Sequence, residues 1–294
     1  MRSKCEVCGS LIRTSRPNKF CSKKCSDSAA KQLLVSLRDK IAGTTAWRPH
    51  PLEPTINIIT PYPVLVIGDV HCPIHDERWV EMAIVTGKHY GCRIVVINGD
   101  LIDAGTISRH LGGEWRRKGE LNDDIEASAA VVKLLCSEFD MVYYTLGNHS
   151  QRLIQRFMGE VAWQNLLKMV FDNDKFKGTE RHFLDINGKI RCLHPRGFSR
   201  IRGKYTAEMA QRYQIHLITG HHHHTASTVS ADGKFQAVEV GTLARIDMFG
   251  YSQYAMHGLP EMENGFAIAL PESERNIIMN FNKFTPFHRL GIKI

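Results

Sequence analysis

Five short polar motifs interrupt the larger part of this chain, and each directly follows a run of β-forming residues. They are GDVH at 68–71, GDLID at 99–103, GNHS at 147–150, LH at 193–194 and GHHH at 220–223. A buried strand that ends in a sharp turn and a carboxylate, carboxamide or imidazole places that side chain at one edge of a sheet. Because the arrangement repeats, we expect metal-ligating groups from distant parts of the sequence to meet at that edge.

The pattern of apolar residues predicts an α/β fold. Continuous apolar or β-branched runs, typical of buried strands, occur at 64–67, 94–97, 141–144, 190–193, 215–219 and 235–240. Helical stretches lie between them at 77–90, 121–139 and 150–170, with Ser150 in position to cap the last one. Alternating strands and helices indicate a layered sheet, in which sites form beyond the carboxyl ends of the strands. We expect the segment 264–284 to complete a second sheet.

The residue types in these motifs suit a pair of divalent cations. Two such ions, roughly 3.5–4 Å apart, need a bridging carboxylate and neutral nitrogen and oxygen ligands on each side. Asp100 is the natural bridge. Mixed carboxylate and imidazole ligation favours manganese, iron or zinc over calcium, and we take Mn²⁺ as the leading candidate. Such a pair of ions polarises a phosphoryl group and activates a water as hydroxide nucleophile.

In this order, the five motifs resemble the calcineurin-like metallophosphoesterase superfamily, over about residues 63–250. The superfamily includes phosphoprotein phosphatases, cyclic-nucleotide phosphodiesterases and double-strand-break repair nucleases. The resemblance implies a two-sheet sandwich flanked by helices, in αββα layers, that binds two divalent metal ions. The residues that it implies for the first metal are Asp69, His71 and His223. Those that it implies for the second are Asn148, His194 and His221, with Asp100 bridging the two ions.

The resemblance also assigns a role to His149, which would protonate the leaving oxygen or steady the equatorial oxygens. Members often carry Asp or Glu after the GNH triplet, where this chain has Ser150. Arg152 is a candidate phosphate contact, with a solvated helix face as an equal alternative. Arg196 and Arg200 are candidates for binding a phosphodiester backbone, and a solvated loop is again the alternative.

Three further polar residues stand beside the implied ligands. We expect Asp103 to be a hydrogen-bond partner within the site rather than a ligand. His222 and His224 alternate with the implied ligands of the GHHH motif. We therefore expect both to point away from the metals.

Two closely spaced cysteine pairs near the N-terminus predict a structural Zn²⁺ site. Cys5 and Cys8 are separated by two residues, and Cys21 and Cys25 by three, which suits adjacent corners of a zinc tetrahedron. The alternative is two disulfides, which a reducing cytosol disfavours. The remaining cysteines are expected to be small core residues: Cys72, Cys92, Cys136 and Cys192.

The net positive charge is concentrated in the same region. Residues 1–50 hold 11 Lys and Arg against 3 Asp and Glu, so they carry the whole net charge of +8. Basic residues also decorate the predicted zinc loop, namely Arg13, Arg16, Lys19, Lys23 and Lys24. This favours nucleic acid, DNA in particular, as the partner. The alternatives are protein binding, with the protein partners unknown, and a purely structural module.

These features divide the chain into three parts. We predict a zinc-finger-like module at 1–30, a helix and proline-rich linker at 31–62 (the helix at 31–40), and a metallophosphoesterase-like domain at 63–294. No stretch approaches the roughly 18 apolar residues that a membrane span needs. The N-terminus also lacks the apolar core of a signal peptide. We therefore expect a cytoplasmic protein that does not bind membranes.

Two enzymatic hypotheses and one non-enzymatic hypothesis follow. The first is a phosphodiesterase or nuclease that cleaves nucleic acid by attack of a metal-activated hydroxide. The second is a phosphomonoesterase for a phosphoprotein or small nucleotide, with the zinc module as a protein adaptor. The third, a zinc-finger binding protein on an inactive scaffold, conflicts with the intact set of implied ligands.

Overall fold

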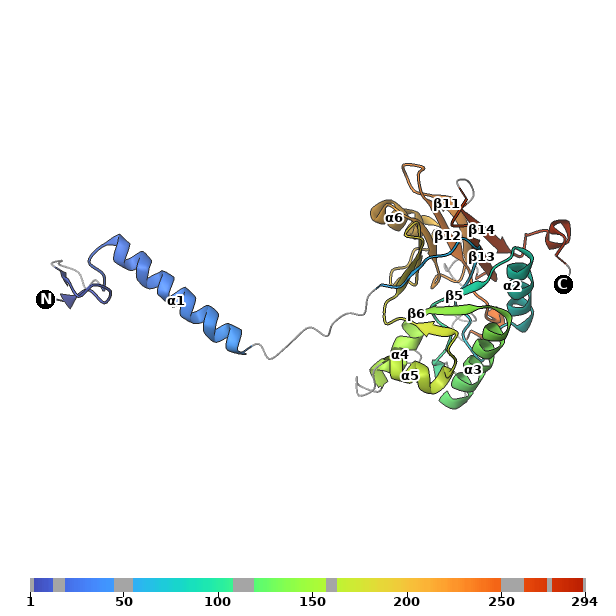
Figure 1. The fold of residues 1–294 in the computed structure, drawn as a ribbon, viewed down its shortest axis with the longest axis horizontal. Helices are drawn as coiled ribbons and strands as arrows, with labels where there is room; N and C mark the ends of the chain where they lie inside the picture. The colour runs from blue at the N-terminus through green and yellow to red at the C-terminus, as the bar shows by residue number, and fades with distance from the viewer. Residues whose placement is uncertain are drawn as a thin grey trace. The chain divides into compact units, whose positions relative to one another are not determined.

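The computed structural model describes residues 3–12, 19–44, 55–107, 119–156, 163–249, 262–273 and 277–292. The chain divides into two compact units, Met1–Leu52 and Glu53–Ile294, whose elements can be followed in Figure 1. Arg13 and Arg16 of the predicted zinc loop lie outside the described residues. Within the described ranges, no helix has the length and apolarity needed to cross a bilayer.

The smaller unit consists of a short hairpin and one long helix. Strand β1 (Ser3–Lys4) pairs antiparallel with β2 (Leu11–Ile12), and helix α1 spans Lys23–Thr44. In the turn between the strands, Gly9 takes a left-handed conformation with φ 73°, and its amide donates a hydrogen bond to the Cys5 carbonyl. The helix therefore begins before the predicted stretch 31–40, between Cys21 and Cys25, and contains the second of these cysteines.

A first six-stranded sheet of the larger unit has the order β14-β13-β4-β5-β6-β7. Its strands are β4 (Val64–Ile67), β5 (Ile94–Asn98), β6 (Met141–Thr145), β7 (Phe176–Gly178), β13 (Gly265–Ala269) and β14 (Ile278–Asn282). Strands β4 to β7 are parallel, β13 pairs antiparallel with β4, and β14 pairs antiparallel with β13. The carboxyl ends of β4, β5 and β6 therefore meet at one edge.

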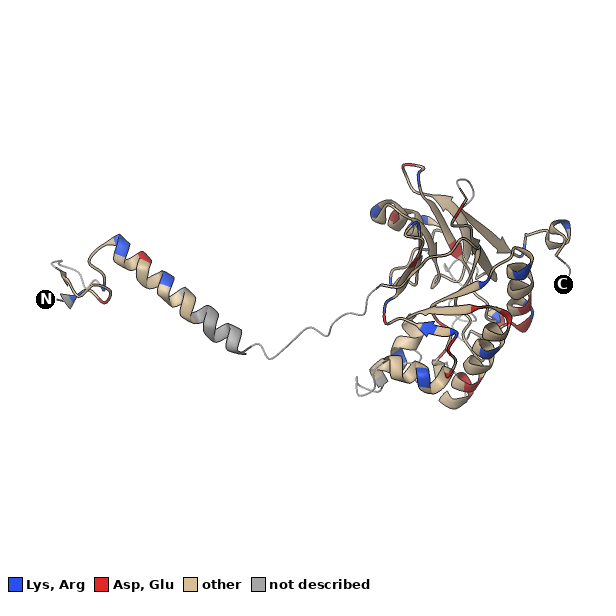
Figure 2. Cartoon of the chain, viewed as in Figure 1, with Lys and Arg blue, Asp and Glu red and all other residues tan. Residues whose placement is uncertain are grey.

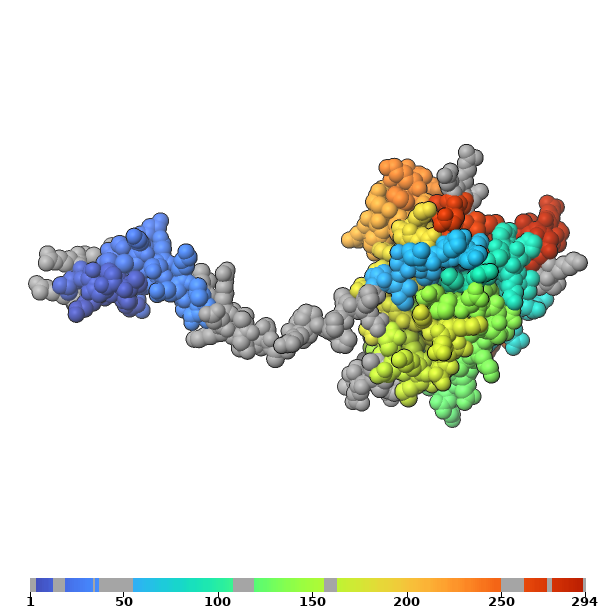
Figure 3. All heavy atoms as spheres, in the orientation of Figure 1, coloured from blue at the N-terminus to red at the C-terminus, as the bar shows by residue number. Residues whose placement is uncertain are grey.

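The second sheet has the order β11-β12-β10-β9-β8-β3. Its strands are β3 (Asn57–Ile58), β8 (Phe183–Ile186), β9 (Ile190–Leu193), β10 (His216–Thr219), β11 (Thr225–Val229) and β12 (Gln236–Val240). Strand β10 lies parallel to both β9 and β12. Strand β3 falls within the predicted linker but pairs with β8, and Figure 3 shows its light-blue segment against the surface of this unit.

Two apolar layers follow from the alternation of side chains along the strands. In β4, Val64 and Val66 pack between the two sheets, while Leu65 and Ile67 face the helices. The helices on the outer face of the first sheet are α2 (Glu77–His89), α3 (Leu121–Glu138), α4 (Asn148–Arg156) and α5 (Trp163–Phe171). Helix α6 (Lys204–Tyr213) packs on the second sheet through Ala210. The predicted two-sheet αββα sandwich is therefore confirmed.

Some local predictions need correction. The helix predicted at 150–170 is two helices, α4 and α5. Ser150 does not cap it, because α4 begins at Asn148 and the buried Ser150 hydroxyl instead hydrogen-bonds the Tyr144 hydroxyl. The four cysteines predicted to be core residues are all buried.

Candidate metal centre

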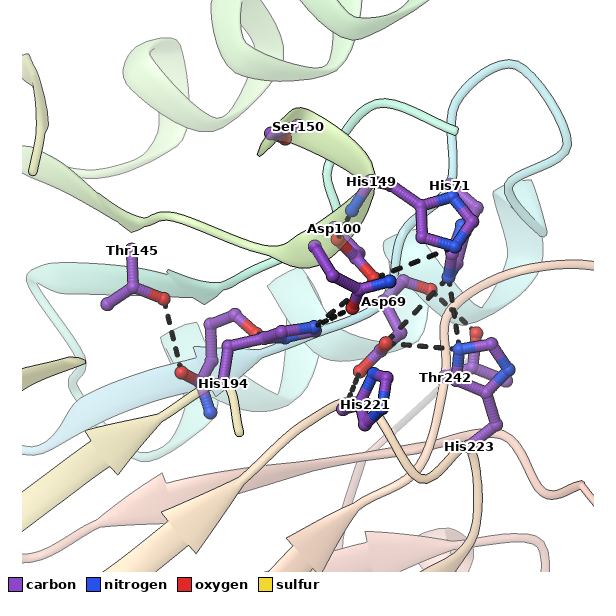
Figure 4. Close-up of polar contacts among 12 residues, drawn as sticks. Asp69, His71, Asp100, Thr145, His149, Ser150, His194, His221, His223 and Thr242 are labelled. Atoms are coloured by element: carbon purple, nitrogen blue, oxygen red, sulfur yellow. Dashed lines mark hydrogen bonds and ion pairs between the residues drawn. The ribbon is translucent and has the colours of Figure 1, made fainter. Parts of the chain in front are cut away.

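The ends of five strands bring the residues implied as metal ligands to one place. Asp69 and His71 follow β4, and Asp100 follows β5. Asn148 follows β6, His194 follows β9, and His221 and His223 follow β10. Figure 4 shows these side chains converging, with His149 entering from the start of α4.

Backbone strain is concentrated at these positions. The left-handed region is uncommon for residues other than glycine, because Cβ meets the neighbouring carbonyl there. Five of the implied ligands adopt it, at φ values between 41° and 76°: Asp69, His71, Asp100, His221 and His223. The turns after three strands are thus held in unfavourable conformations, as is common where side chains are aimed at a ligand.

Two motif glycines leave room for the ligands. A Cβ on Gly147 would lie 2.1 Å from Asp100 Oδ1, and one on Gly99 would lie 2.0 Å from His194 Nδ1. Gly99 also has φ 81°. Any side chain at either position would displace an implied ligand, which explains why the motifs carry glycine there.

A first cluster consists of the buried residues Asp69, His71 and His223. His223 Nε2 lies 3.1 Å from Asp69 Oδ1, and His71 Nε2 lies 3.7 Å from the same oxygen. The two Nε2 atoms are themselves 3.1 Å apart. Two imidazole nitrogens that converge on one carboxylate oxygen form the donor set of a first-row divalent cation.

A second cluster consists of Asp100, His194 and His221, with Asn148 beside it. His194 Nε2 lies 3.2 Å from Asp100 Oδ2 and 2.9 Å from Asn148 Oδ1. Asp100 Oδ2 is buried, and its contact with His194 Nε2 does not have the geometry of a hydrogen bond. A buried carboxylate oxygen is costly unless positive charge meets it, so the residues present fit a metal ion.

The electrostatics of the two clusters also fit a cation. Burial raises the pKa of the Asp69 and Asp100 carboxyls, but the neighbouring histidines lower it by more than burial raises it. The pKa of both carboxyls is therefore well below its ordinary range. Burial lowers the pKa of His71, but hydrogen bonds to Asp103 and Asp69 raise it to about 10. Against the same effect of burial, Asp100 raises the pKa of His194 to about 9. A divalent cation would replace the protons on these rings, since a ligating imidazole must be neutral.

His149 stands next to the clusters and is oriented by its neighbours. Its backbone amide donates to Asp100 Oδ1 at 2.8 Å, and its Nδ1 lies 2.5 Å from the Asp103 carbonyl oxygen. Asp103 Oδ1 lies 3.1 Å from His71 Nδ1 and 3.3 Å from His149 Nδ1. Asp103 therefore has the expected place of a hydrogen-bond partner that fixes two imidazoles.

The three candidate arginines lie at different places. Arg152 reaches the site, with Nη1 3.0 Å from His149 Nδ1. Arg196 is exposed and donates to Gln151 Oε1 at 3.0 Å, which ties it to helix α4. Arg200 is exposed, and no contact with a described residue connects it to the ligands. The structure thus brings Arg152 to the centre, while Arg196 and Arg200 are exposed on the loop that follows His194.

The comparison with known proteins agrees with this geometry. Residues 62–233, more than half of the chain, match the calcineurin-like phosphoesterase family. The chain belongs to this family. It is therefore a metal-dependent phosphate-ester hydrolase, and the resemblance of its motifs is confirmed. A search of curated proteins finds no match to this phosphoesterase.

Solved structures similar to this phosphoesterase include proteins of several kinds. A Vps29 from Entamoeba histolytica, solved with zinc, is 16% identical over 76% of this chain and 94% of its own, with a TM-score of 0.40. The phosphoesterase Yfce from E. coli is 13% identical over 70% and 87%, with a TM-score of 0.37. The Pseudomonas putida nuclease MPE is 14% identical over 74% and 87%, with a TM-score of 0.26. Likenesses this distant leave the substrate of the phosphoesterase open.

The cysteine cluster of the phosphoesterase fits a small zinc module. The Sγ atoms of Cys8 and Cys21 are 3.4 Å apart, and those of Cys21 and Cys25 are 3.6 Å apart. These separations exceed the roughly 2.05 Å of a disulfide. They approach the separation of sulfurs around zinc, which follows from Zn–S bonds of about 2.3 Å. All four ligand atoms, including that of buried Cys5, lie within 4.8 Å of one another.

Two residues that hold the site were not predicted. Asn98 ends β5 and is fully buried, and its Nδ2 donates to the carbonyls of Leu193 and Ile218, which joins the two sheets beneath the ligands. An asparagine directly after an apolar run was a signal that could have found it. Glu239 lies inside β12, where a single acidic residue has no motif to mark it.

Glu239 explains the orientation of the other two histidines of the GHHH motif. Its carboxylate oxygens lie 2.9 Å from His222 Nδ1 and 2.6 Å from His224 Nδ1. Both imidazoles therefore turn away from the implied ligands, as predicted. The three side chains are buried together beneath the motif.

Replacing Glu239→Gln is expected to destabilise the phosphoesterase by about 3 kcal/mol, because two buried imidazoles lose their carboxylate. Burial raises the pKa of Glu239, but His222 and His224 lower it to about 2, below its ordinary 4.5. A lowered pKa means that this stabilisation is present above pH 4.5 and is lost as the pH falls toward 2. Thermal unfolding from about pH 7 to pH 3 should therefore show the variant's deficit shrinking with acid.

The matched control for this experiment is Glu208→Gln, an exposed carboxylate on α6 whose ion pair with Lys204 spans 4.0 Å. Its unfolding temperature should stay within a degree or so of the wild type, since exposed pairs contribute little. Equal unfolding temperatures of wild type and Glu239→Gln at neutral pH would contradict a stabilising role for the cluster.

Proposed function

We propose that this phosphoesterase is a phosphodiesterase or nuclease that acts on nucleic acid, DNA in particular. The observation that carries the proposal is the pairing of the metal centre with a basic, four-cysteine unit in one chain. The described part of that unit carries exposed lysines, among them Lys23 and Lys24 at the start of α1, and Figure 2 shows basic residues along this helix. Such charges attract a phosphate backbone and raise its local concentration.

The two clusters would each hold one divalent ion, with Mn²⁺ the leading candidate and iron or zinc the alternatives. Asp69, His71 and His223 would ligate the first ion. The ligands of the second would be Asn148, His194 and His221, with Asp100 shared by both. When bound, such a pair polarises a phosphoryl group and lowers the pKa of a water. The cysteine cluster would hold one structural Zn²⁺.

The remaining residues of the site would handle the proton and the phosphate. His149 would give its proton to the leaving oxygen as a general acid. Asp103, 3.3 Å from His149 Nδ1, would hold the ring in place during that transfer. Arg152 would turn its guanidinium from His149 toward two non-bridging phosphate oxygens, to which it can donate two parallel hydrogen bonds.

Degradation of end-labelled single- and double-stranded DNA in Mn²⁺ tests this proposal. Wild type should cleave, and His149→Ala should lower kcat roughly 10²- to 10⁴-fold, the range of general-acid catalysis, without losing bound metal. His89→Ala, an exposed histidine at the end of α2, is the matched control and should cleave normally. A product ladder separates exonucleolytic from endonucleolytic action.

The outcome that would contradict the proposal is a wild type that does not cleave DNA but hydrolyses an aryl phosphate. The protein would then be a phosphomonoesterase, and its cysteine unit would serve as a protein adaptor. We also propose a cytoplasmic location, because none of the eight cysteines forms a disulfide and a reducing compartment maintains that state.

A further inference from the structure

The loop that follows His194 carries an exposed aromatic ring close to the metal centre. It has the sequence PRGFSRIRG over residues 195–203 and leads into α6. Phe198 is 47% exposed and Ile201 is 62% exposed. Single exposed apolar side chains are common on protein surfaces, so the place of this aromatic ring, next to the candidate metal centre, is what points to a partner with an apolar face.

Phe198 is not loosely placed, because it rests on the buried histidine cluster. Its ring centroid lies 5.7 Å from that of His222, edge-on at 74°, and 6.5 Å from that of His224. The carbonyl of Gly197 lies 3.0 Å from His222 Nε2, which ties the loop backbone to the same imidazole. Glu239 fixes both rings from below. The underside of Phe198 is therefore packed, and part of its ring faces solvent.

The same contacts relate Phe198 to the proposed ligands. His222 lies between His221 and His223 in the sequence, and its ring centroid is 5.9 Å from that of His221. One ring therefore separates Phe198 from a residue proposed to ligate the second metal. These two separations limit the distance between Phe198 and His221, so a base on Phe198 and a phosphate at the centre could belong to the same strand.

The charge of the loop indicates what kind of substrate group this is. Residues 195–203 include three arginines and no acidic residue. Arg202 pairs with Glu263 at 2.6 Å, but Arg196 and Arg200, two residues before and two residues after Phe198 in the sequence, are exposed. An exposed aromatic ring on a loop with two exposed cations suits an unpaired base and the phosphates next to it.

We propose that Phe198 is a stacking platform for an unpaired base of a single-stranded nucleic acid, and that it thereby sets the substrate preference of the metal centre. The inference rests on the proposed function, since it assumes a nucleic-acid substrate. A base within a duplex keeps both faces stacked on its neighbours, so a ring of this kind favours single strands. Stacking uses the π-face that every base has, so little sequence preference is expected.

The test compares substitutions of Phe198 on two probes in the full-length protein with Mn²⁺. One probe is an end-labelled single-stranded thymidine oligonucleotide, and the other is an abasic chain with the same number of phosphates. Phe198→Ala and Phe198→Leu should raise KM for the thymidine probe about tenfold, with kcat less affected, because both lose the aromatic face. Phe198→Trp should keep the wild-type KM. On the abasic probe, the difference between wild type and Phe198→Ala should shrink below about twofold, since no base is left to stack.

Phe284→Ala is the matched control, because Phe284 is another exposed phenylalanine, at 76%, on the turn after β14. It should behave as wild type on both probes. Two outcomes would overturn the stacking role while the nuclease proposal stands, provided that wild type cleaves both probes. One is an unchanged KM of Phe198→Ala for the thymidine probe, and the other is an equal rise of its KM on both probes. If wild type cleaves neither probe, the proposed function fails, and the role of Phe198 fails with it.

Discussion

Asp100→Asn is expected to lower kcat at least about a thousandfold, equivalent to roughly 4 kcal/mol of transition-state stabilisation. The reason is that a neutral amide cannot bridge two cations. The Oδ2 atom that would be replaced is buried and lies 3.2 Å from His194 Nε2, whereas Oδ1, which accepts from the His149 amide at 2.8 Å, can remain an acceptor. The variant should therefore fold but bind less metal. Turnover of an aryl phosphate diester and metal content per chain are the measurements.

The control for this prediction is Asp185→Asn, which removes a half-buried carboxylate of β8 that pairs with Arg191 at 2.8 Å. It should keep both its metal and its activity, since it lies outside the two clusters. Wild-type activity in Asp100→Asn would refute the assignment of a dinuclear centre. Loss of activity in both variants would instead point to a general effect on the fold.

Removing residues 1–45 is expected to weaken binding of DNA roughly 10- to 100-fold at low salt and to flatten its dependence on salt. The deletion takes away most of the basic residues that carry the net charge of +8. The larger unit has its own core and should retain turnover of a small aryl phosphate ester. Fluorescence anisotropy of a labelled oligonucleotide over a range of salt concentrations measures the affinity and its slope.

A finer variant separates charge from folding in the same unit. Cys8→Ser with Cys21→Ser leaves every basic residue in place but removes two proposed zinc ligands. Because so short a segment depends on its metal to fold, we expect loss of one zinc per chain and a smaller drop in affinity than in the deletion. If the deletion binds DNA as tightly as the full chain, the smaller unit does not target the enzyme to nucleic acid.

Much of the sheet could be predicted because its strands are buried on both faces. The runs 64–67, 94–97 and 141–144 are continuously apolar, as parallel strands covered on both sides must be, and they became β4, β5 and β6. The motifs at their ends are local in sequence, so their position at the sheet edge followed directly. The family could be inferred from their order alone, and the match over residues 62–233 agrees.

Helix boundaries were predicted less well, for identifiable reasons. Helix α1 begins at Lys23, but residues 23–30 are mostly Ser, Lys, Asp and Ala, so no apolar stripe marks them. Helix α6 buries only Thr206 and Ala210, too few to give a periodic signal. Ser150 was predicted to cap the helix, but the helix begins two residues earlier and the Ser150 hydroxyl is hydrogen-bonded to the Tyr144 hydroxyl.

By itself, the sequence determined the fold class, the kinds of metal-binding groups and their position at the sheet edge where the strands end. These depend on local patterns: apolar runs, turn glycines and the residue that follows each strand. Only the tertiary structure decided that Asn98 joins two sheets across 95 residues, that Glu239 turns His222 and His224 away from the metals, and that Phe198 rests on those rings. Such contacts arise from the packing of one element on another. The pattern of residues within one segment does not show which distant segment will pack against it.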